Sequence, residues 1–332
     1  MNGIRLRRLA VLVAMAAIVP ALWVEGPDAA TAVEPTPVPI TTIAAVGDLA
    51  CDSDNTSFKN GLGTSTKCQQ MQVSNVMVAD TSVTDVLGLG DFQYYCDDAA
   101  DFEVSYTPSW GRVNDLMTPV AGNHEYTGGH DPYGKECPAG NSTAQTYFNY
   151  FGAAAHPETV GHFSFDLGNW HLVGLNAQCS RKNVGGCGAT AAQTKWLEAD
   201  LAASTQPCTL AFWHQPLFTG AGGGKTTAYQ PWWNSLYAAG ADVVLNGHRH
   251  NYQRFGSLNP SGARDADNGI TQYVAGTGGE SLQSFSSTAF PQPEYKLKGY
   301  GYLRLDLEEN GWSSDFVTST GSAVDNFSGT CH

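Results

Sequence analysis

Residues 243–250 constrain the fold of this chain more than any other stretch, because two histidines directly follow a short apolar run. The run at residues 243–245 ends in Asn-Gly, and His248 and His250 then lie two residues apart. A short apolar run bounded by a turn residue predicts a buried strand, and Gly247 allows a sharp turn at its end. In an extended segment, residues two apart point the same way. The stretch therefore predicts two imidazoles at one point beyond a strand, which favours a metal site.

Four other apolar runs, at residues 41–46, 83–89, 117–121 and 209–213, are also followed by a polar side chain. The polar residues that follow these runs are Asp48, Asp91, Asn123 and His214, and Tyr94 lies three residues beyond Asp91. Helical segments separate the first three runs, which favours a parallel sheet in an α/β fold. Since ligand sites lie at the carboxyl ends of such strands, we expect these side chains to meet at one edge.

The seven polar side chains divide into two sets of metal ligands that share one carboxylate. Carboxylates and a phenolate suit a hard, trivalent ion, whereas imidazoles and an amide oxygen suit a borderline divalent ion. The first set is Asp48, Tyr94 and His250, and the second set is Asn123, His214 and His248. Asp91 is expected to bridge both ions, because two ions about 3.5–4 Å apart can clamp the oxygens of an in-line displacement.

Simpler interpretations exist for several of these residues. Asp48 and Asp91 could be turn formers after glycine, and Asn123 could be a left-handed turn residue. His214 could be a hydrogen-bonded core histidine. Tyr94 has Tyr95 as its neighbour, and either phenol could simply pack. Arg249, between His248 and His250, is expected to point away from them.

The remaining segments predict one domain over residues 41–332, with two packed sheets and outer helices. Residues 162–176 predict an antiparallel hairpin. Thr190 is predicted to open a helix, with Gln193 completing a capping box. Other helices are expected at residues 69–78 and 231–239, and late strands at 270–275, 300–307 and 312–318.

The N-terminus predicts export. Three arginines precede an apolar run at residues 9–24, and small residues at 30–32 fit a cleavage site, as is typical of a secretory signal peptide. We expect a signal peptide at residues 1–32 and an extended, proline-containing lead-in at 33–40. An uncleaved membrane anchor is the alternative. No later segment is apolar enough to span a bilayer, so we expect a secreted, extracellular or periplasmic protein without membrane contact after cleavage.

The cysteines agree with export, and the net charge limits the kind of ligand. Eight cysteines in an exported chain imply disulfides, although their spacing does not determine the connectivity. Pairing of neighbours along the chain would give Cys51–Cys68, Cys96–Cys137, Cys179–Cys187 and Cys208–Cys331. A thiolate metal site is the alternative, but the chain has no Cys-x-x-Cys pair. The net charge of −14 argues against nucleic acid as a bulk ligand.

Taken together, the ordered motifs carry a family resemblance. The motifs are Gly47-Asp48, Gly90-Asp91-Phe92-Gln93-Tyr94, Gly122-Asn123-His124-Glu125, His214 and Gly247-His248-Arg249-His250. This set resembles the calcineurin-like metallophosphoesterases, and the tyrosine at its spacing resembles the purple acid phosphatase branch. The resemblance departs at Ala50, where the family has Gly or His, and at Gln253, where a Glu is usual.

The resemblance implies a four-layer α/β/β/α sandwich of two mixed sheets. It also implies ferric iron held by Asp48, Asp91, Tyr94 and His250, and ferrous iron, zinc or manganese held by Asp91, Asn123, His214 and His248. His124 would be the catalytic residue that protonates the leaving alcohol, and Asn123 and His124 would contact the substrate.

The function that follows is an exported, dinuclear metal-dependent phosphoesterase. We expect it to hydrolyse small phosphomonoesters by in-line attack of a metal-bound hydroxide. A phosphodiesterase or nucleotidase with the same metal pair is the first alternative. A catalytically silent module that binds metal or phosphate is the second. The oligomeric state does not follow from the sequence.

Overall fold

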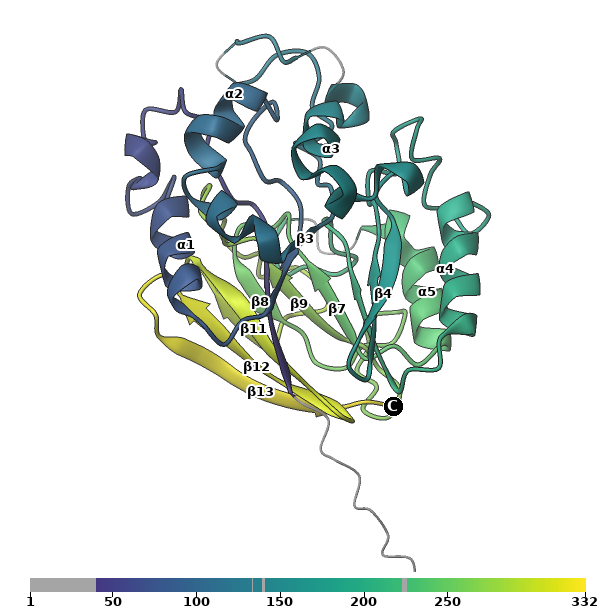
Figure 1. Ribbon diagram of the computed structural model, residues 1–332. Coiled ribbons are helices and arrows are strands. Elements are labelled where there is room, and N and C mark those ends of the chain that lie inside the picture. Colours follow the sequence, from purple (N-terminus) through teal and green to yellow (C-terminus); the bar gives the residue numbers. More distant parts are fainter. Residues whose placement is uncertain (1–39, 133, 139–140, 223–225) are drawn as a thin grey trace, which may run out of the picture. The chain divides into compact units, whose positions relative to one another are not determined.

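Two mixed β-sheets form the centre of the structure, a computed structural model that describes residues 40–132, 134–138, 141–222 and 226–332 (Figure 1). In order across the first sheet, the strands are β13 (Ala323–Thr330), β12 (Gly311–Thr318), β11 (Gly301–Glu308), β1 (Thr41–Val46), β2 (Asp85–Gly88) and β3 (Met117–Pro119). The strands of the second sheet are β10 (Tyr295–Leu297), β8 (Tyr252–Arg254), β9 (Thr271–Ala275), β7 (Val243–Asn246), β6 (Cys208–Phe212), β5 (Trp170–Gly174) and β4 (Phe163–Leu167). The predicted signal peptide and the lead-in up to residue 39 lie outside the described residues.

Each sheet contains a parallel group of strands whose carboxyl ends lie at one edge. In the first sheet β1, β2 and β3 are parallel neighbours, and in the second β5, β6, β7 and β9 are. The predicted ligand motifs follow β1, β2, β3, β6 and β7. The topology therefore brings the motifs from both sheets toward the same edge.

Side chains that alternate along the strands divide the interior into three apolar layers. Ile43 and Ala45 of β1 pack in the same core as Val243 and Leu245 of β7, so this core lies between the sheets. Ala44, the neighbour of Ile43, belongs instead to the core under the helices. A strand with a period of two thus buries both of its faces, which explains its nearly continuous apolar sequence.

Helices cover the outer face of each sheet and complete four layers. The helices and short helical turns over the first sheet are α1 (Gln70–Ala79), α2 (Ala99–Asp101), η2 (Phe102–Tyr106), η3 (Trp110–Leu116) and α3 (Gln145–Phe151). Over the second sheet lie α4 (Ala192–Ala203) and α5 (Gln230–Ala238) (Figure 1). The predicted four-layer α/β/β/α sandwich is confirmed.

Four disulfides join the cysteines in consecutive pairs along the chain. The bonded pairs are Cys51–Cys68, Cys96–Cys137, Cys179–Cys187 and Cys208–Cys331. The last pair links β6 of the second sheet to the residue that follows β13 of the first. No cysteine of the described residues is free, so the thiolate alternative has no donors there.

The predicted capping box at Thr190 and Gln193 is wrong. Helix α4 begins at Ala192, and its N-cap residue Ala191 makes no side-chain cap. Gln193 instead accepts a hydrogen bond from Asn176 N at 2.8 Å and donates one to Asn176 O at 3.1 Å. In this position the buried side-chain amide of Gln193 makes two hydrogen bonds, one with the N–H and one with the C=O of Asn176. In a capping box it would make only one.

Candidate metal centre

The hydroxyl of Tyr94 lies at the meeting point of three predicted ligands. It is 2.8 Å from Asp48 Oδ1, 2.9 Å from Asp91 Oδ2 and 3.1 Å from His250 Nε2. His250 Nε2 is in turn 2.9 Å from Asp48 Oδ1. The four side chains predicted for the ferric site therefore converge on one point.

The remaining predicted ligands gather on the other side of Asp91. His214 Nε2 lies 3.1 Å from Asp91 Oδ2 and 3.2 Å from Asn123 Oδ1. The ring centroids of His214 and His248 are 5.1 Å apart, and ligand atoms of Asp91, His214 and His248 all lie within 4.8 Å of one another. Asp91 Oδ2 thus contacts a member of each set, as a bridging carboxylate must.

Three of the proposed ligands have left-handed backbone conformations, and a glycine allows two of the motifs to approach each other closely. Asp48, Asp91 and His248 have φ of 61°, 55° and 67°, in the left-handed region that few side chains favour. A Cβ on Gly122 would overlap the Asp91 carboxylate. Glycine therefore allows the third motif to approach the second closely enough for both to reach one centre.

Glu125 holds two of the motif loops together. Its carboxylate accepts hydrogen bonds from the backbone nitrogens of Asp91, Phe92 and Gly122 at 2.9, 2.7 and 2.5 Å. Burial and the neighbouring Asp91 raise the pKa of Glu125 to about 7. No role was predicted for Glu125, although its place directly after His124 in the third motif was a usable signal.

Partners outside the centre orient the histidine rings. His214 Nδ1 lies 2.6 Å from Leu89 O, which leaves Nε2 for the centre. His250 Nδ1 lies 2.9 Å from Ser281 Oγ and 3.2 Å from Glu280 Oε2. Such partners select the tautomer and the ring angle of a ligand. Glu280 and Ser281 were not predicted, because they lie about thirty residues beyond the last motif and carry no motif of their own.

The donor set fits two cations. Asp48, Asp91, Tyr94 and His214 are each at most 2% exposed, and they bring oxygen and nitrogen lone pairs to one buried point. Burial acts to raise the pKa of Asp48, but the His250 imidazolium outweighs it and the pKa is lowered. The pKa of His250 is raised to about 10, against the effect of burial, chiefly by Asp48. Asp48 and the His250 imidazolium compensate each other in this pair, and a metal ion can take the place of the proton on His250, since an imidazole ligand binds metal in its neutral form.

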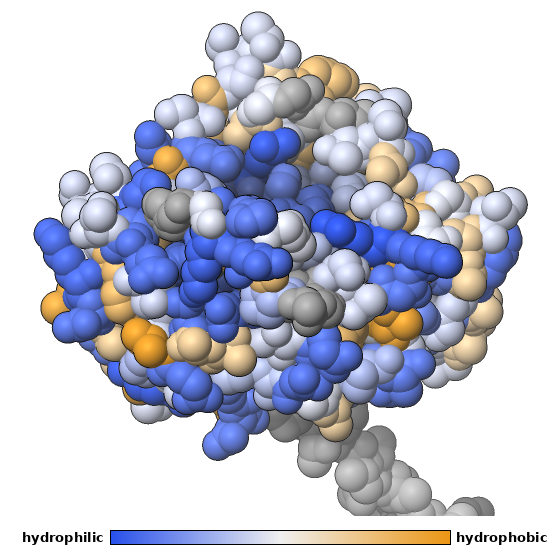
Figure 2. Space-filling view, turned by 90° about the horizontal axis from the view of Figure 1, so that it is seen from above, coloured by the Kyte–Doolittle hydropathy of each residue, from blue (hydrophilic) through white to orange (hydrophobic). Residues whose placement is uncertain are grey.

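A polar cavity of about 260 Å³ opens over this centre. Its lining comes from Lys67, Asp91, Tyr94, Tyr95, Asn123, His124, His248, Arg249, His250, Glu280, Ser281 and Gln283. Hydrophilic residues predominate on the face above the strand ends, and the surface there is hollowed (Figure 2). Arg249 is among the residues that line the cavity, and Gln253, which stands where the family usually has Glu, is not.

His124 lies beside the first metal-ligand set. Its backbone N–H donates to Asp91 Oδ1 at 2.8 Å, and its Nδ1 lies 2.9 Å from Tyr95 O. The rings of His124 and Tyr94 have centroids 4.1 Å apart. All eight predicted site residues thus meet at one place, and their roles as ligands and as the acid stay predictions.

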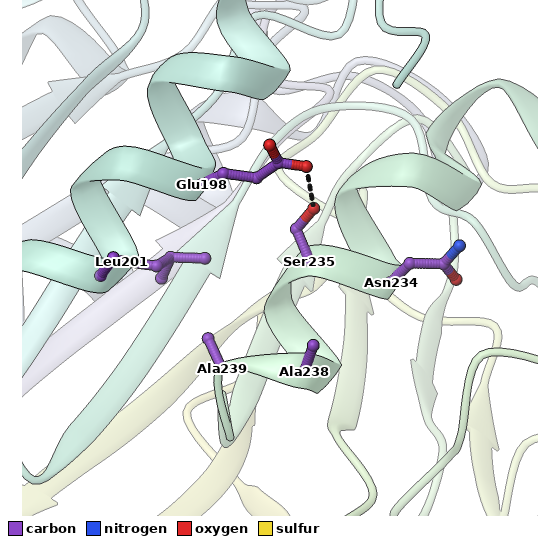
Figure 3. A pocket seen from close by; sticks show the side chains of 7 residues that line it. Glu198, Leu201, Asn234, Ser235, Ala238 and Ala239 are labelled. Atoms are coloured by element: carbon purple, nitrogen blue, oxygen red, sulfur yellow. Dashed lines mark hydrogen bonds between the residues drawn. The ribbon is translucent and has the colours of Figure 1, made fainter. Parts of the chain in front are cut away.

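A groove and a side-chain cluster elsewhere among the described residues lack the donor set of a metal centre. A larger groove of about 560 Å³ lies between α4 and α5, where Ser235 Oγ donates to Glu198 Oε1 at 3.4 Å beside Leu201, Ala238 and Ala239 (Figure 3). It has a single carboxylate and no histidine. Cys208, Asp242 and Cys331 also cluster, but both cysteines belong to a disulfide.

With this geometry established, comparison with known proteins identifies the class. Residues 42–252 match the family described as Calcineurin-like phosphoesterase, and the chain belongs to that family. Purple acid phosphatase 15 of Arabidopsis thaliana is 27% identical over 231 residues, which cover 64% of this chain and 40% of that protein. The chain thus spans well under two thirds of this relative's length. The predicted resemblance to the purple acid phosphatase branch is confirmed.

Solved structures share the fold. Purple acid phosphatase PPD1 from yellow lupin (Lupinus luteus) seeds has a TM-score of 0.66 at 17% identity, covering 89% of this chain and 55% of that one. GAP50, described as the anchor in the inner membrane complex of Plasmodium, has a TM-score of 0.58 at 14% identity, covering 88% and 89%. At these identities the two structures support the fold alone.

Proposed function

We propose that this chain is an exported, dinuclear metallophosphoesterase that hydrolyses phosphomonoesters, as a purple acid phosphatase does. The observation that carries the proposal is the position of Asp91 Oδ2, 2.9 Å from the Tyr94 hydroxyl and 3.1 Å from His214 Nε2. A carboxylate in contact with both ligand sets suits a pair of metal ions better than a single one. The name of Arabidopsis purple acid phosphatase 15 supports the same activity.

Two sets of side chains would hold the metals. Asp48, Asp91, Tyr94 and His250 would bind ferric iron, and Asp91, Asn123, His214 and His248 would bind ferrous iron, zinc or manganese. When bound, the metal pair supplies Lewis acidity and lowers the pKa of water. The chain's own contribution is to fix the ligand atoms, through Glu125 at the loops and through Leu89 O, Glu280 and Ser281 at the rings.

His124 is the proposed proton donor to the leaving alcohol. Because the carbonyl oxygen of Tyr95 can only accept, Nδ1 of His124 carries a hydrogen and donates it over 2.9 Å. Nε2 is then the ring atom that can pass a proton to a departing oxygen. His124 and Asn123 both line the cavity, where a bound phosphate ester would contact them.

Export is the third element of the proposal. Four disulfides are typical of proteins that mature in an oxidising compartment. Within the described ranges, no helix has the length and apolar character to cross a membrane. The predicted signal peptide at residues 1–32 and the single domain at 41–332 complete the proposal.

Metal analysis together with an aryl phosphate assay tests this function. The purified protein should carry about two metals per chain and hydrolyse the ester, and Asp91→Ala should abolish hydrolysis. Full activity of Asp91→Ala would overturn the proposal. Relative rates on an aryl monoester and a bis-aryl diester would show whether the chain is instead a diesterase.

A catalytically silent binding module is a second candidate, because GAP50, described as an anchor, shares the fold. Such a module would bind phosphate and two metals without turnover. The proposed proton donor His124 in the cavity favours an enzyme, since a binding module has no need of a proton donor there. The same assay separates the two candidates.

A further inference from the structure

Two basic side chains line the cavity over the metal centre, although the chain as a whole is acidic. They are Lys67 and Arg249, in a chain with 17 basic and 31 acidic side chains. The acidic groups that interact electrostatically with them are Glu280, with Lys67, and Asp48, with Arg249, and both carboxylates also contact His250. Within the described ranges, neither cation forms a side-chain hydrogen bond or an ion pair. Their charge is therefore available to a ligand in the cavity.

The main chain around Lys67 is firmly anchored. The adjacent Cys68 forms a disulfide with Cys51 and donates from its backbone nitrogen to Glu280 O at 2.8 Å. Lys67 O accepts from Thr64 N at 2.8 Å, and the Lys67 backbone bridges to Ser281. The lysine side chain thus starts from a fixed point on the Ser281 side of the cavity.

Arg249 is fixed on another side, beside Gly222. Its backbone lies in a tight turn, with Arg249 N bonded to Gly247 O at 2.8 Å. The guanidinium nitrogens lie 3.2–3.3 Å from where a Cβ on Gly222 would stand, so glycine makes room for them. Gln253 holds this segment by accepting from Gly220 N at 2.6 Å.

The guanidinium of Arg249 carries an unused donor. Its Nε is buried and has no hydrogen-bond partner among the described residues. A buried N–H without a partner is unfavourable, and an arginine has five donors in a fork that matches phosphate and carboxylate oxygens. The described residues therefore leave the hydrogen-bonding capacity of this arginine incomplete.

We infer that Lys67 and Arg249, which line different sides of the cavity, both attract a second anionic group on the substrate and so form a subsite for it. The inference rests on the proposed function, in which the first phosphate group lies at the metal centre. The substrates favoured by this subsite are small phosphate esters that carry a second phosphate or a carboxylate. The cavity of about 260 Å³ suits such compact molecules.

Matched substrates and matched variants test the subsite. Fructose 1,6-bisphosphate and fructose 6-phosphate differ by one phosphate, and kcat/KM on each should be measured for the metal-loaded wild type, Arg249→Gln and Lys67→Gln. The wild type should prefer the bisphosphate, and each substitution should reduce that preference roughly tenfold, as for the loss of one charge-assisted bond. Lys59→Gln, at an exposed lysine of the same loop, should keep the wild-type preference.

A binding measurement separates failure of the subsite from failure of the proposed function. Calorimetry with methylenediphosphonate, which phosphatases cannot hydrolyse, and with inorganic phosphate gives an affinity ratio that needs no turnover. The ratio should favour the diphosphonate in the wild type and fall in Arg249→Gln and Lys67→Gln. Equal affinities in the wild type, or a ratio unchanged in both variants, would overturn the subsite even if the enzyme is active. If neither sugar phosphate is hydrolysed, the calorimetric ratio alone decides.

Discussion

Glu125 accepts a hydrogen bond from the backbone nitrogen of Asp91 at 2.9 Å, and this contact places a buried acid directly behind the bridging residue of the proposed metal pair. The same carboxylate accepts from Phe92 and Gly122. The shape of two motif loops therefore depends on one side chain that lines no part of the cavity.

The first prediction concerns Glu125→Gln. A glutamine has one accepting oxygen, so at least one buried N–H loses its partner at a cost of about 1–3 kcal/mol. We expect the folded variant to bind the metals at least about tenfold more weakly, as measured by competition with a chelator. Glu103→Gln, at an exposed position, is the control. Unchanged metal affinity in Glu125→Gln would contradict the role given to this residue.

The second prediction concerns the colour of the protein. If the Tyr94 phenolate binds ferric iron, the iron-loaded protein should show a visible charge-transfer band, and Tyr94→Phe should remove it. Tyr95→Phe is a close control, because it removes the neighbouring phenol, whose hydroxyl lies 3.2 Å from Glu280 Oε1. A colourless and fully active protein that carries zinc alone would place the chain in another branch of the family.

The third prediction separates proton donation from metal binding. His124→Ala should lower kcat by about 10²–10⁴-fold on an alkyl phosphate, whose leaving group needs a proton. The loss should be much smaller on an aryl phosphate with an acidic phenol. Equal losses on both esters would mean that His124 acts on the loop or the substrate and not on the leaving group. His130→Ala, at an exposed histidine of the following loop, is the control.

The fourth prediction concerns stability against pH at Asp52, away from the proposed ligands. Burial, aided by the Asp101 carboxylate, raises the pKa of Asp52 to about 6. The folded state therefore binds this proton more tightly than the unfolded state, so stability falls as the pH rises from about 4 through 6.

Asp52→Asn removes that loss of stability, because an amide does not ionise. The hydrogen bond is kept, since the amide oxygen can still accept from Asp54 N. We expect a gain on the order of 1–2 kcal/mol at neutral pH and none near pH 4, measured by thermal unfolding. Asp54→Asn controls for the removal of one charge. A gain of equal size at both pH values would mean that the ionisation of Asp52 is not its cause.

The motifs could be predicted because each follows an apolar run, and because a glycine precedes Asp48, Asp91, Asn123 and His248, although not His214. The position of Asp48, Asp91 and His248 just after a predicted strand was enough to predict that their side chains meet. Glu280 and Ser281 could not be found in this way, since their contact with His250 depends on the return of a distant loop.

The long apolar strands in the middle of each sheet could be predicted from the sequence, whereas some short or exposed strands could not. Strands β8, β10 and β13 were missed. β10 lies at an edge and has three residues, and β13 is an edge strand with a largely exposed face, so neither shows a long apolar run. Gln193 was misread because its spacing from Thr190 fits a cap, whereas its actual partner is a backbone seventeen residues earlier.

The Cys208–Cys331 bond makes a closed ring of the chain between β6 and the C-terminus. A single cut by a protease in any loop of that ring would leave both fragments covalently joined and still paired in their sheets. If the chain is exported as proposed, a protease that cuts it in this ring would not separate the proposed metal ligands from one another. Reduction before electrophoresis would then reveal fragments that a non-reducing gel does not.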